Sequence, residues 1–416
     1  IPSAALLDDD RYLPQLSCQR LHLVECQPGA VPGGERACSC ELDDLPAIDL
    51  LRAVALNFIG CGCTGAEQEE NRHAHDLFHI PTFNHTTLMI SDSTQKPLAC
   101  WQGTELYNGE VIPCLTVIFH TTGCSWNRCR MCGYRFERTR ITDRSEKIHA
   151  LLSQLAWLLA HHPPESFRMV KIFTSGSFFD EEEVPHEARE AIGKAFEGKI
   201  VIAESRTEFI NTDTITPFKE QSDDGCGTSA LYVAMGLETT NDYIREKCID
   251  KGHTFADFIE AVSNARKAGA GVKTYLMLKP LFLTEREAVD DMKRSIAEAG
   301  PYSDIMSMNL CTVQRRTEVE RYWKQGAYRP PYLWSAVDIL LSANFFVQSD
   351  PVGGGKIRGP HNCGTCDREF VHGITEYSLS GDREILRTLM DTSCTCKKEW
   401  EYVLAHEEPW CMPLTR

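Results

Sequence analysis

From about residue 97 onward, short apolar runs alternate with longer stretches in which apolar residues recur every three or four positions. Short runs of this kind are typical of strands and the longer stretches of helices, so the pattern indicates serial βα units. Such units close into a full or partial barrel whose chemistry lies at the carboxyl ends of the strands. The strand candidates are Leu115–His120, Val170–Phe173, Ile200–Ala203, Leu231–Gly236, Thr274–Leu278, Ile305–Leu310 and Phe345–Gln348.

Two of the intervening helices carry start and stop signals. Asp143 and Glu146 have capping-box spacing ahead of an apolar stripe, and a second helix is predicted to begin near Thr254 and stop at Gly269. Residues 1–95 show little periodicity. We expect them to form an irregular extension of unknown role, with metal binding by their Cys and His residues as the alternative. The chain thus divides into an extension (1–95), an α/β partial barrel of (βα)6 type (96–345) and a Cys-bearing segment (346–416).

Charge and composition narrow the classes of function. The 416 residues carry a formal net charge of -16, which disfavours sequence-blind nucleic-acid binding but allows a local basic patch. No run approaches the roughly 18 apolar residues of a membrane span, and no secretory signal is evident, so we expect a cytoplasmic protein without a membrane partner. The 19 cysteines cluster as C-x-C and C-x2-C pairs, which favours metal or Fe–S ligation over disulfides.

The segment HTTGCSWNRCRMCGY places Cys124, Cys129 and Cys132 directly after the first strand candidate, in a C-x4-C-x2-C pattern. Three thiolates on a [4Fe-4S] cubane leave one iron open. S-adenosylmethionine (SAM) can fill that vacancy, and an electron then cleaves it to methionine and a 5′-deoxyadenosyl radical. The alternatives are a zinc site with a fourth ligand from elsewhere, or three unrelated cysteines. The first gap is one residue longer than in the commonest radical-SAM motif, which suggests an outlying family.

Eight segments together carry a closer likeness, over roughly three quarters of the chain. They are PLACW (97–101), GCSWNRCRMCGY (123–134), TSGSFFDEEEVP (174–185), ESRTEF (204–209), GLETT (236–240), LMLKPLFLTE (276–285), RPPYLWS (329–335) and GPHNCGTCD (359–367). In these segments the chain resembles the archaeosine-biosynthesis radical-SAM family, the radical-SAM or beta subunit of archaeosine synthase. That family is itself similar to the radical-SAM domain of the Elongator catalytic subunit.

The resemblance implies a radical-SAM TIM-like barrel and a radical lyase reaction. A partner subunit attaches lysine to a 7-cyano-7-deazaguanine base in tRNA, and this family then breaks the lysine C–N bond to leave archaeosine. The implied cofactors are a [4Fe-4S] cluster and SAM. The implied partners are tRNA, the lysine-attaching subunit and an electron donor such as a ferredoxin or flavodoxin.

Candidate SAM-binding residues follow the later strands. By resemblance, Ser175, Gly176 and Ser177 match the loop that meets the SAM amino group; an ordinary turn is the alternative. Glu204 and Arg206 can take the ribose hydroxyls and the methionyl carboxylate, with a structural ion pair as the alternative. The remaining candidates are Glu238, of the same type; Lys279, for SAM or the adduct's carboxylate unless it is a solvated surface lysine; and Gln314, after the next strand.

The C-terminal segment holds a second sulfur motif. Cys363 and Cys366 form a C-x2-C knuckle, and Cys394 and Cys396 a C-x-C pair. Two pairs of thiolates suit tetrahedral zinc, while a second Fe–S cluster or ancillary cysteines are the alternatives.

Arginines gather around the first sulfur motif and after the sixth strand: Arg128, Arg130, Arg135, Arg138 and Arg140, then Arg315, Arg316, Arg321 and Arg329. They suit a phosphate contact zone for folded RNA, with ion pairing to neighbours such as Glu137 and Glu318 as the alternative. Two other functions stay open: a radical-SAM enzyme with another substrate, such as an Elongator-like tRNA modifier, and a zinc-dependent RNA-binding scaffold without catalysis. No acetyltransferase domain is recognisable after the barrel, which disfavours the Elongator-like variant.

Overall fold

The computed structural model describes residues 94–227, 229–409 and 413–415. Among them, eight strands form one sheet in the order β1 to β8. The strands are β1 (Ala99–Tyr107), β2 (Glu110–Phe119), β3 (Met169–Thr174), β4 (Ile200–Glu204), β5 (Ala230–Glu238), β6 (Gly271–Leu278), β7 (Ile305–Leu310) and β8 (Gln348–Asp350). Strands β2 to β8 are parallel and β1 is antiparallel to β2. The predicted α/β partial barrel is confirmed.

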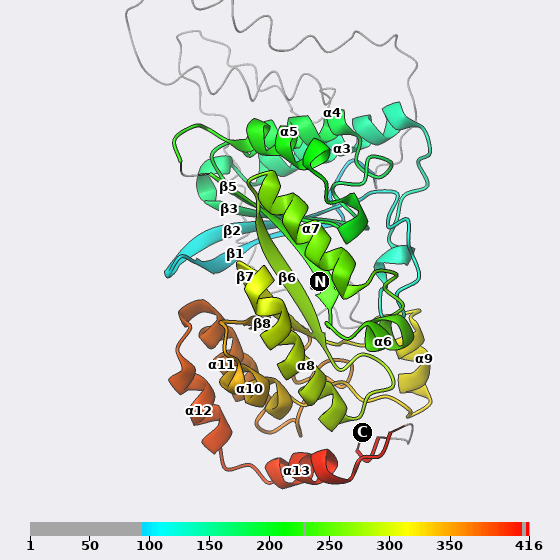
Figure 1. The fold of residues 1–416 in the computed structure, drawn as a ribbon, viewed down its shortest axis with the longest axis vertical. Helices are drawn as coiled ribbons and strands as arrows, with labels where there is room; N and C mark the ends of the chain where they lie inside the picture. The colour runs from blue at the N-terminus through cyan, green and yellow to red at the C-terminus, as the bar shows by residue number, and fades with distance from the viewer. Residues whose placement is uncertain (1–93, 228, 410–412, 416) are drawn as a thin grey trace, which may run out of the picture.

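Helices cover the outer face of the curled sheet (Figure 1). Those between the strands are α3 (Arg144–His161), α4 (His186–Ala195), α5 (Thr212–Ser222), α6 (Asp242–Ile244), α7 (Phe255–Lys267) and α8 (Glu285–Ala299), followed by α9 (Glu318–Lys324) and α10 (Leu333–Ser342). Both predicted helix starts are confirmed. The Asp143 side chain accepts a hydrogen bond from the Glu146 amide, and Thr254 forms a full capping box with Asp257.

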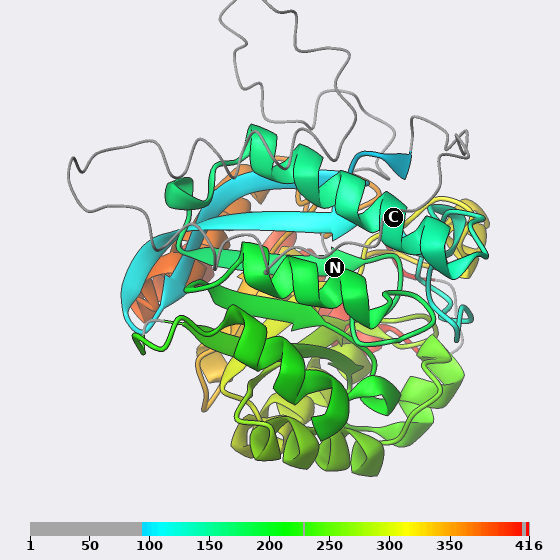
Figure 2. The same ribbon diagram turned by 90° about the horizontal axis from the view of Figure 1, so that it is seen from above.

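The sheet separates two apolar layers. Outward-facing side chains such as Leu115, Val117 and Val201 pack against the helices. Inward-facing side chains such as Phe173 and Tyr275 fill the inside of the curl. Helices cover the outer face of the parallel strands, and side chains fill the inside of the curled sheet. Both faces of these strands are therefore buried, which explains their continuous apolar runs. Figure 2 shows α3, α4 and α5 lying side by side along the sheet.

Two strand predictions need correction. Strand β1 was not predicted, although Asn108 and Gly109 both have positive φ and form the tight turn that joins it to β2. The last strand was predicted at Phe345–Gln348, but β8 begins at Gln348. Phe345 and Phe346 are exposed, and pairing with β7 begins only at Gln348, so the apolar run before it is not part of the strand.

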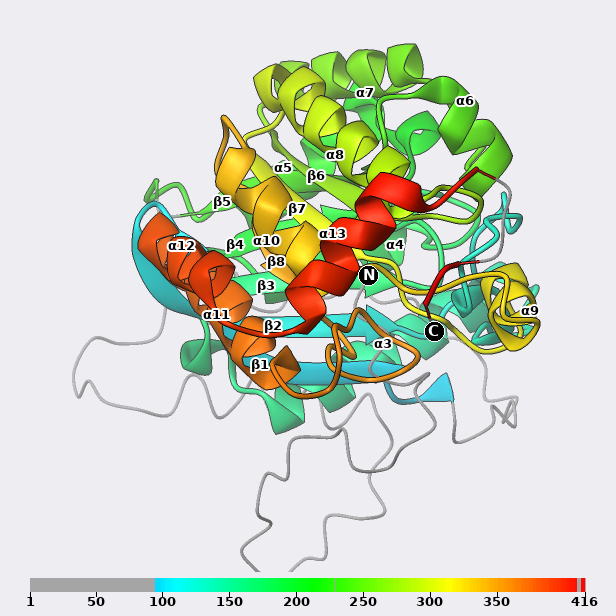
Figure 3. The same cartoon turned by 90° about the horizontal axis from the view of Figure 1, so that it is seen from below.

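The C-terminal segment adds α11 (Asp367–Ser380), α12 (Arg383–Asp391) and α13 (Cys396–His406). Seen from below, α13 lies beside α8 and α10, at the β8 end of the sheet (Figure 3). Strand β8 belongs to the sheet although it falls beyond residue 345, so the sheet extends into the predicted C-terminal segment. The expected extension 1–95, with its Cys and His residues, lies almost wholly outside the described residues. No helix among the described residues is long and apolar enough to cross a membrane.

Candidate radical-SAM site

The three cysteines of the first motif lie on the loop between β2 and α3, at the carboxyl end of the sheet. This loop is fastened to two neighbouring loops. The amide of Cys124 donates to the carbonyl of Ser175 at 3.2 Å, and the amide of Gly133 donates to Oε1 of Gln314 at 2.6 Å. The residues after β3 and β7 therefore fix the cysteine loop from both sides.

The spacing of the three sulfur atoms favours a cluster over a single ion. Within the described part of the chain, two groups bring three or more candidate ligand atoms within 4.8 Å of one another, and Cys124, Cys129 and Cys132 are not among them. Ligands around one zinc ion would have to meet that closely. In a cubane each thiolate binds a separate iron, so a wider triangle is expected.

Cys129 and Cys132 are held in an apolar setting. Burial raises the pKa of the Cys129 thiol to about 12, against the opposing effect of Lys251. The pKa of Cys132 is also raised, again mainly by burial. Because metal ligation requires the thiolate, a strong local positive charge, such as that of cluster irons, must accompany ionisation of these groups.

Gly176 lies where the loop after β3 touches the cysteine loop. A Cβ at this position would come within 2.5 Å of the backbone N and Cα of Cys124, and within 2.2 Å of Glu183 Oε2. Glycine is therefore required by close backbone packing at the first cysteine. Its neighbours are also fixed: Ser175 Oγ donates to the Glu137 carbonyl at 3.0 Å, and the Ser177 amide donates to Glu183 Oε2 at 2.5 Å.

Arg206 follows β4 and is buried with spare hydrogen-bonding capacity. Its Nε donates to Glu208 at 2.6 Å and its Nη1 to the Lys251 carbonyl at 2.8 Å. Nη2 is buried and has no hydrogen-bond partner among the described residues. A buried orphan guanidinium donor calls for an explanation, and an anionic ligand group is one that satisfies it. Arg206 forms an ion pair with Glu208 and not with Glu204, so the structural ion pair considered as the alternative is present for Arg206 alone.

Glu204, at the end of β4, is buried, and its pKa is raised to about 7, chiefly by burial and partly by Glu238. Lys251 lowers it. With a pKa near neutral pH, this buried carboxyl can ionise at a modest cost in free energy and accept hydrogen bonds from ligand hydroxyls.

Glu238 is paired with Lys251, a residue that no sequence motif indicated. Lys251 Nζ donates to Glu238 Oε1 at 2.7 Å, and the two side chains are 11% and 7% exposed. Burial opposes the charge of Lys251, but Glu238 and then Cys129 raise its pKa overall. Lys251 thus places a cation next to the cysteine loop. The loop that carries it follows a short π-helical turn (Arg245–Ile249) and a left-handed Asp250, features that a motif search does not detect.

His253, on the same loop, was also missed. Both of its ring nitrogens are buried without a hydrogen-bond partner among the described residues, and its pKa is lowered to about 2, first by burial and then by Lys251 and Arg245. Among the described residues, Arg206 Nη2 is thus an unsatisfied donor near Cys129, and the loop that carries Lys251 adds the two unsatisfied ring nitrogens of His253. These residues, with the cysteine triangle, fit a cluster and a SAM molecule.

Lys279 and Gln314 have protein partners. Lys279 is neither exposed nor free: its Nζ donates to Glu285 Oε2 at 2.7 Å, and both side chains are almost fully buried. The alternative of a solvated surface lysine is therefore wrong. Gln314 supports the cysteine loop through Gly133, which places it close to the site without showing a ligand contact. The SAM-binding roles of all these residues stay predictions.

Most of the candidate phosphate-contact arginines are exposed, Arg128 and Arg321 among them, and contacts within the protein occur in exposed and buried ones alike. Several are engaged within the protein: Arg130 and Arg321 with Glu318, Arg128 with Asp250, and Arg329 with the carbonyls of Pro330, His361 and Asn362. Arg329 is buried, so its inclusion in a phosphate contact zone is wrong. Arg135 lies over the Phe136 ring, as does Arg316. Arg138, Arg140, Arg315 and Arg316 are exposed.

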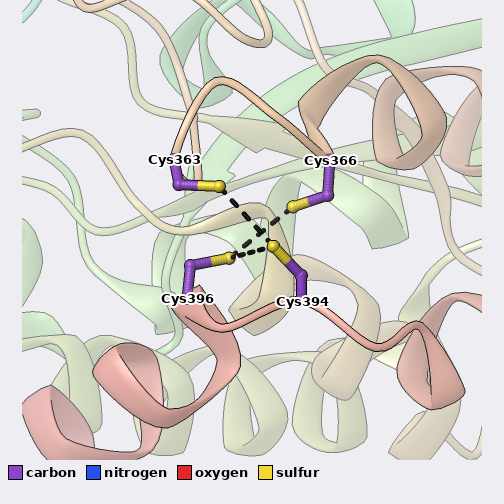
Figure 4. Close-up of side chains that lie close together, drawn as sticks. All are labelled: Cys363, Cys366, Cys394 and Cys396. Carbon is purple, nitrogen blue, oxygen red and sulfur yellow. Dashed lines mark hydrogen bonds between the residues drawn. The ribbon is translucent and has the colours of Figure 1, made fainter.

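The four C-terminal cysteines meet in space, as their spacing predicted. Their sulfur atoms all lie within 4.8 Å of one another (Figure 4). The second such group, Glu181, His186 and Glu187, lies at the surface and is already bridged by Arg144, so it resembles an ordinary salt-bridge network.

The chain is similar to known proteins over most of its length. Residues 118–295 match the model of the Radical SAM superfamily. The chain is 42% identical over 327 residues to archaeosine synthase subunit beta of Methanosarcina acetivorans, covering 76% of this chain and 92% of that protein. It is 37% identical over 318 residues to the protein of the same name from Thermococcus kodakarensis, covering 73% and 95%.

Solved structures are more distant. A queuine lyase from Clostridium spiroforme bound to SAM and queuine is 20% identical, with a TM-score of 0.37 and coverage of 50% of this chain and 78% of that one. The Elp3 protein of Methanocaldococcus infernus is 15% identical, with a TM-score of 0.38 and coverage of 56% and 59%. On the strength of the two sequence relatives, the chain belongs to the archaeosine synthase subunit beta family and is a radical SAM enzyme of archaeosine biosynthesis.

Proposed function

We propose that this protein is a radical lyase that cleaves the lysine C–N bond of a lysine-adducted 7-cyano-7-deazaguanine base in tRNA to give archaeosine. The observation that carries the proposal is the wide triangle of Cys124, Cys129 and Cys132 near Arg206, whose buried Nη2 has no hydrogen-bond partner among the described residues, in a chain of this family. The cluster and SAM, when bound, supply the radical chemistry that removes hydrogen from unactivated carbon.

The chain's own residues bind and orient these groups. Cys124, Cys129 and Cys132 would ligate the cluster, and Arg206 Nη2 would take the methionyl carboxylate of SAM. Glu204 would accept from the ribose hydroxyls. Lys251 would balance the negative charge that the ligated thiolates bring to a buried site, since it is held there by Glu238.

Substrate recognition would use the exposed arginines near the site. Arg138 and Arg140 on the cysteine loop and Arg316 after β7 are suited to phosphate contacts, which position a folded RNA without reading its sequence. The target base would have to leave its stack to reach the interior of the barrel. Because the whole chain has a net charge of -16, RNA binding would depend on this local patch.

The proposal also names partners. The two relatives bear the name of a subunit, which supports an assembly with the subunit that attaches lysine. A low-potential electron donor such as a ferredoxin or flavodoxin would reduce the cluster. We place the reaction in the cytoplasm.

The test is an anaerobic assay of Cys124→Ala with lysine-adducted tRNA, SAM and a chemical reductant. Cys226→Ala is the matched control, because Cys226 is exposed and lies on the loop before β5, at the amino end of the strands and opposite the end that carries the proposed ligands. We expect the control to cleave SAM and form archaeosine, and Cys124→Ala to do neither. Archaeosine formation by Cys124→Ala at the control's rate would refute the assignment. A wild-type protein that cleaves SAM but leaves the lysine adduct intact would point to a different radical-SAM substrate.

A further inference from the structure

Four thiols from two distant segments of the C-terminal region point toward one common centre (Figure 4). Cys363 and Cys366 come from the loop before α11, and Cys394 and Cys396 from the turn that begins α13. The sulfur–sulfur distances are 3.6 Å for Cys363–Cys394, 3.6 Å for Cys366–Cys396 and 3.4 Å for Cys394–Cys396. All four cysteines are free.

These distances match one small ion. In a tetrahedron with Zn–S bonds of about 2.3 Å, ligand sulfurs are separated by about 1.6 times the bond length, or about 3.8 Å. A cubane would need each thiolate on its own iron and hence a wider set of sulfurs, as the first motif has. The geometry therefore disfavours the second Fe–S cluster that the sequence left open.

The surroundings are built to hold thiolates. The Trp334 indole N–H donates to Cys396 Sγ at 3.3 Å, and the side-chain amide (Nδ2) of Asn362 donates to Cys366 Sγ at 3.4 Å. The Asp367 carboxylate fixes the shape of the knuckle, because it accepts hydrogen bonds from the backbone N–H groups of Asn362, Cys363 and Gly364 at 2.9, 3.1 and 2.7 Å. Such outer hydrogen bonds orient metal ligands and stabilise their charge.

We infer that Cys363, Cys366, Cys394 and Cys396 form a structural zinc site that clamps α11 and α13 onto α10 at the β8 end of the barrel. Four protein ligands close the coordination sphere, so the ion has no open position for a substrate. Trp334 of α10, which donates to the site, packs on Phe370 of α11 and on Trp400 of α13, with ring centroids 4.4 and 6.0 Å away. The ion would thus join the same three helices that this aromatic cluster joins.

The site is also connected to the barrel. Arg329 donates to the carbonyls of His361 and Asn362 at 2.9 and 3.3 Å, directly before the knuckle. A few residues further along, the Tyr332 amide donates to Glu285 at 2.9 Å, and Glu285 pairs with Lys279 at the end of β6. Loss of the ion would therefore loosen the C-terminal helices and weaken the support of the β6 end.

The test measures metals in the full chain purified anaerobically. We expect about one zinc per chain in addition to cluster iron. The X-ray absorption spectrum at the zinc edge should fit four sulfur neighbours at about 2.3 Å. Because this measurement uses the wild-type protein, it does not depend on a variant that folds. Zinc with nitrogen or oxygen ligands, iron in place of zinc, or two disulfides among the four cysteines would each overturn the inference.

Variants then assign the ligands. Cys363→Ser/Cys394→Ser should lose most of the zinc, keep the cluster iron and sulfide, and melt at a lower temperature than wild type, whereas Cys226→Ser should match wild type in all three. Full zinc occupancy in the double variant would count against the site, as would loss of iron instead of zinc. The outcome is separate from the proposed reaction, because zinc content can be as expected whether or not lysine is cleaved.

Discussion

Replacing Lys279 by Met tests whether this lysine supports the barrel or binds a ligand. Lys279 and Glu285 form an ion pair at 2.7 Å, and their side chains are 3% and 0% exposed. Glu285 also accepts hydrogen bonds from the Tyr332 amide and the Ser335 hydroxyl. Burial alone would raise the pKa of Glu285, but Lys279 and Arg329 lower it overall, so the carboxylate is charged at neutral pH. Its contribution to stability is present above the ordinary carboxyl pKa and is lost as the pH falls through the lowered value.

Lys279→Met removes the cation and leaves the Glu285 charge buried. Breaking one partner of a buried pair costs about 3–5 kcal/mol. At roughly 2 °C per kcal/mol for a chain of this size, the melting temperature should fall by about 6–10 °C. The affinity for SAM should stay within about threefold of wild type, a difference of less than 1 kcal/mol.

The assay is thermal unfolding under anaerobic conditions, followed by equilibrium dialysis with SAM on the folded protein. Lys279→Met/Glu285→Gln is the matched control, because both members of the pair are then neutral and the amide oxygen can still accept from Tyr332. We expect it to regain at least half of the lost stability. If Lys279→Met melts like wild type but binds SAM at least tenfold more weakly, about 1.4 kcal/mol, then Lys279 is a ligand contact and the structural interpretation is refuted.

Three further predictions concern the SAM site. Gly176→Ala should displace the Cys124 backbone, since the new Cβ would lie 2.5 Å from it, and should lower iron content after anaerobic reconstitution; Gly103→Ala, with open space around it, should not. Arg206→Lys should weaken SAM binding about tenfold or more, because a charge-assisted hydrogen bond is worth about 1.5–3 kcal/mol, and unchanged affinity would exclude the proposed carboxylate contact. The raised pKa of Glu204, about 7, means that the folded state holds a proton which the unfolded state releases, so wild-type stability should fall as the pH rises from about 4.5 to about 7. Glu204→Gln should lack this fall, which amounts to at most about 3 kcal/mol, and parallel pH profiles of the two proteins would contradict it.

Much of the site could be predicted from local patterns. The strand candidates placed the cysteine loop, Ser175 and Glu204 at one end of the sheet, because parallel strands all end at the same edge. The C-x2-C and C-x-C pairs predicted a shared site for Cys363 and Cys394 although they are far apart in sequence. In both cases the spacing of residues along the chain was enough to predict which side chains lie close together.

Other features depend on tertiary contacts that spacing does not encode. Lys251 reaches Glu238 only because a π-helical turn and a left-handed Asp250 reverse the chain after β5. Lys279 has positive φ and pairs with Glu285 instead of pointing freely from the barrel. Strand β1 was missed because it is half exposed and weakly periodic, although its Asn108-Gly109 turn was a usable signal.

The two sulfur sites differ in whether they leave a coordination position open, which is the property that distinguishes a catalytic metal site from a structural one. At Cys124, Cys129 and Cys132 the sulfurs do not meet closely enough to share one ion, and the buried Nη2 of nearby Arg206 has no hydrogen-bond partner among the described residues. A cluster and an anionic ligand would complete such a site. At the C-terminal knuckle four thiols already meet within 4.8 Å and receive N–H donors from the protein, so a single ion would leave no position open. Because both sites use cysteine, counting iron and zinc in the wild-type protein does not say which site holds which metal. Measuring both metals in variants of each site distinguishes them, since each substitution should remove one metal and spare the other.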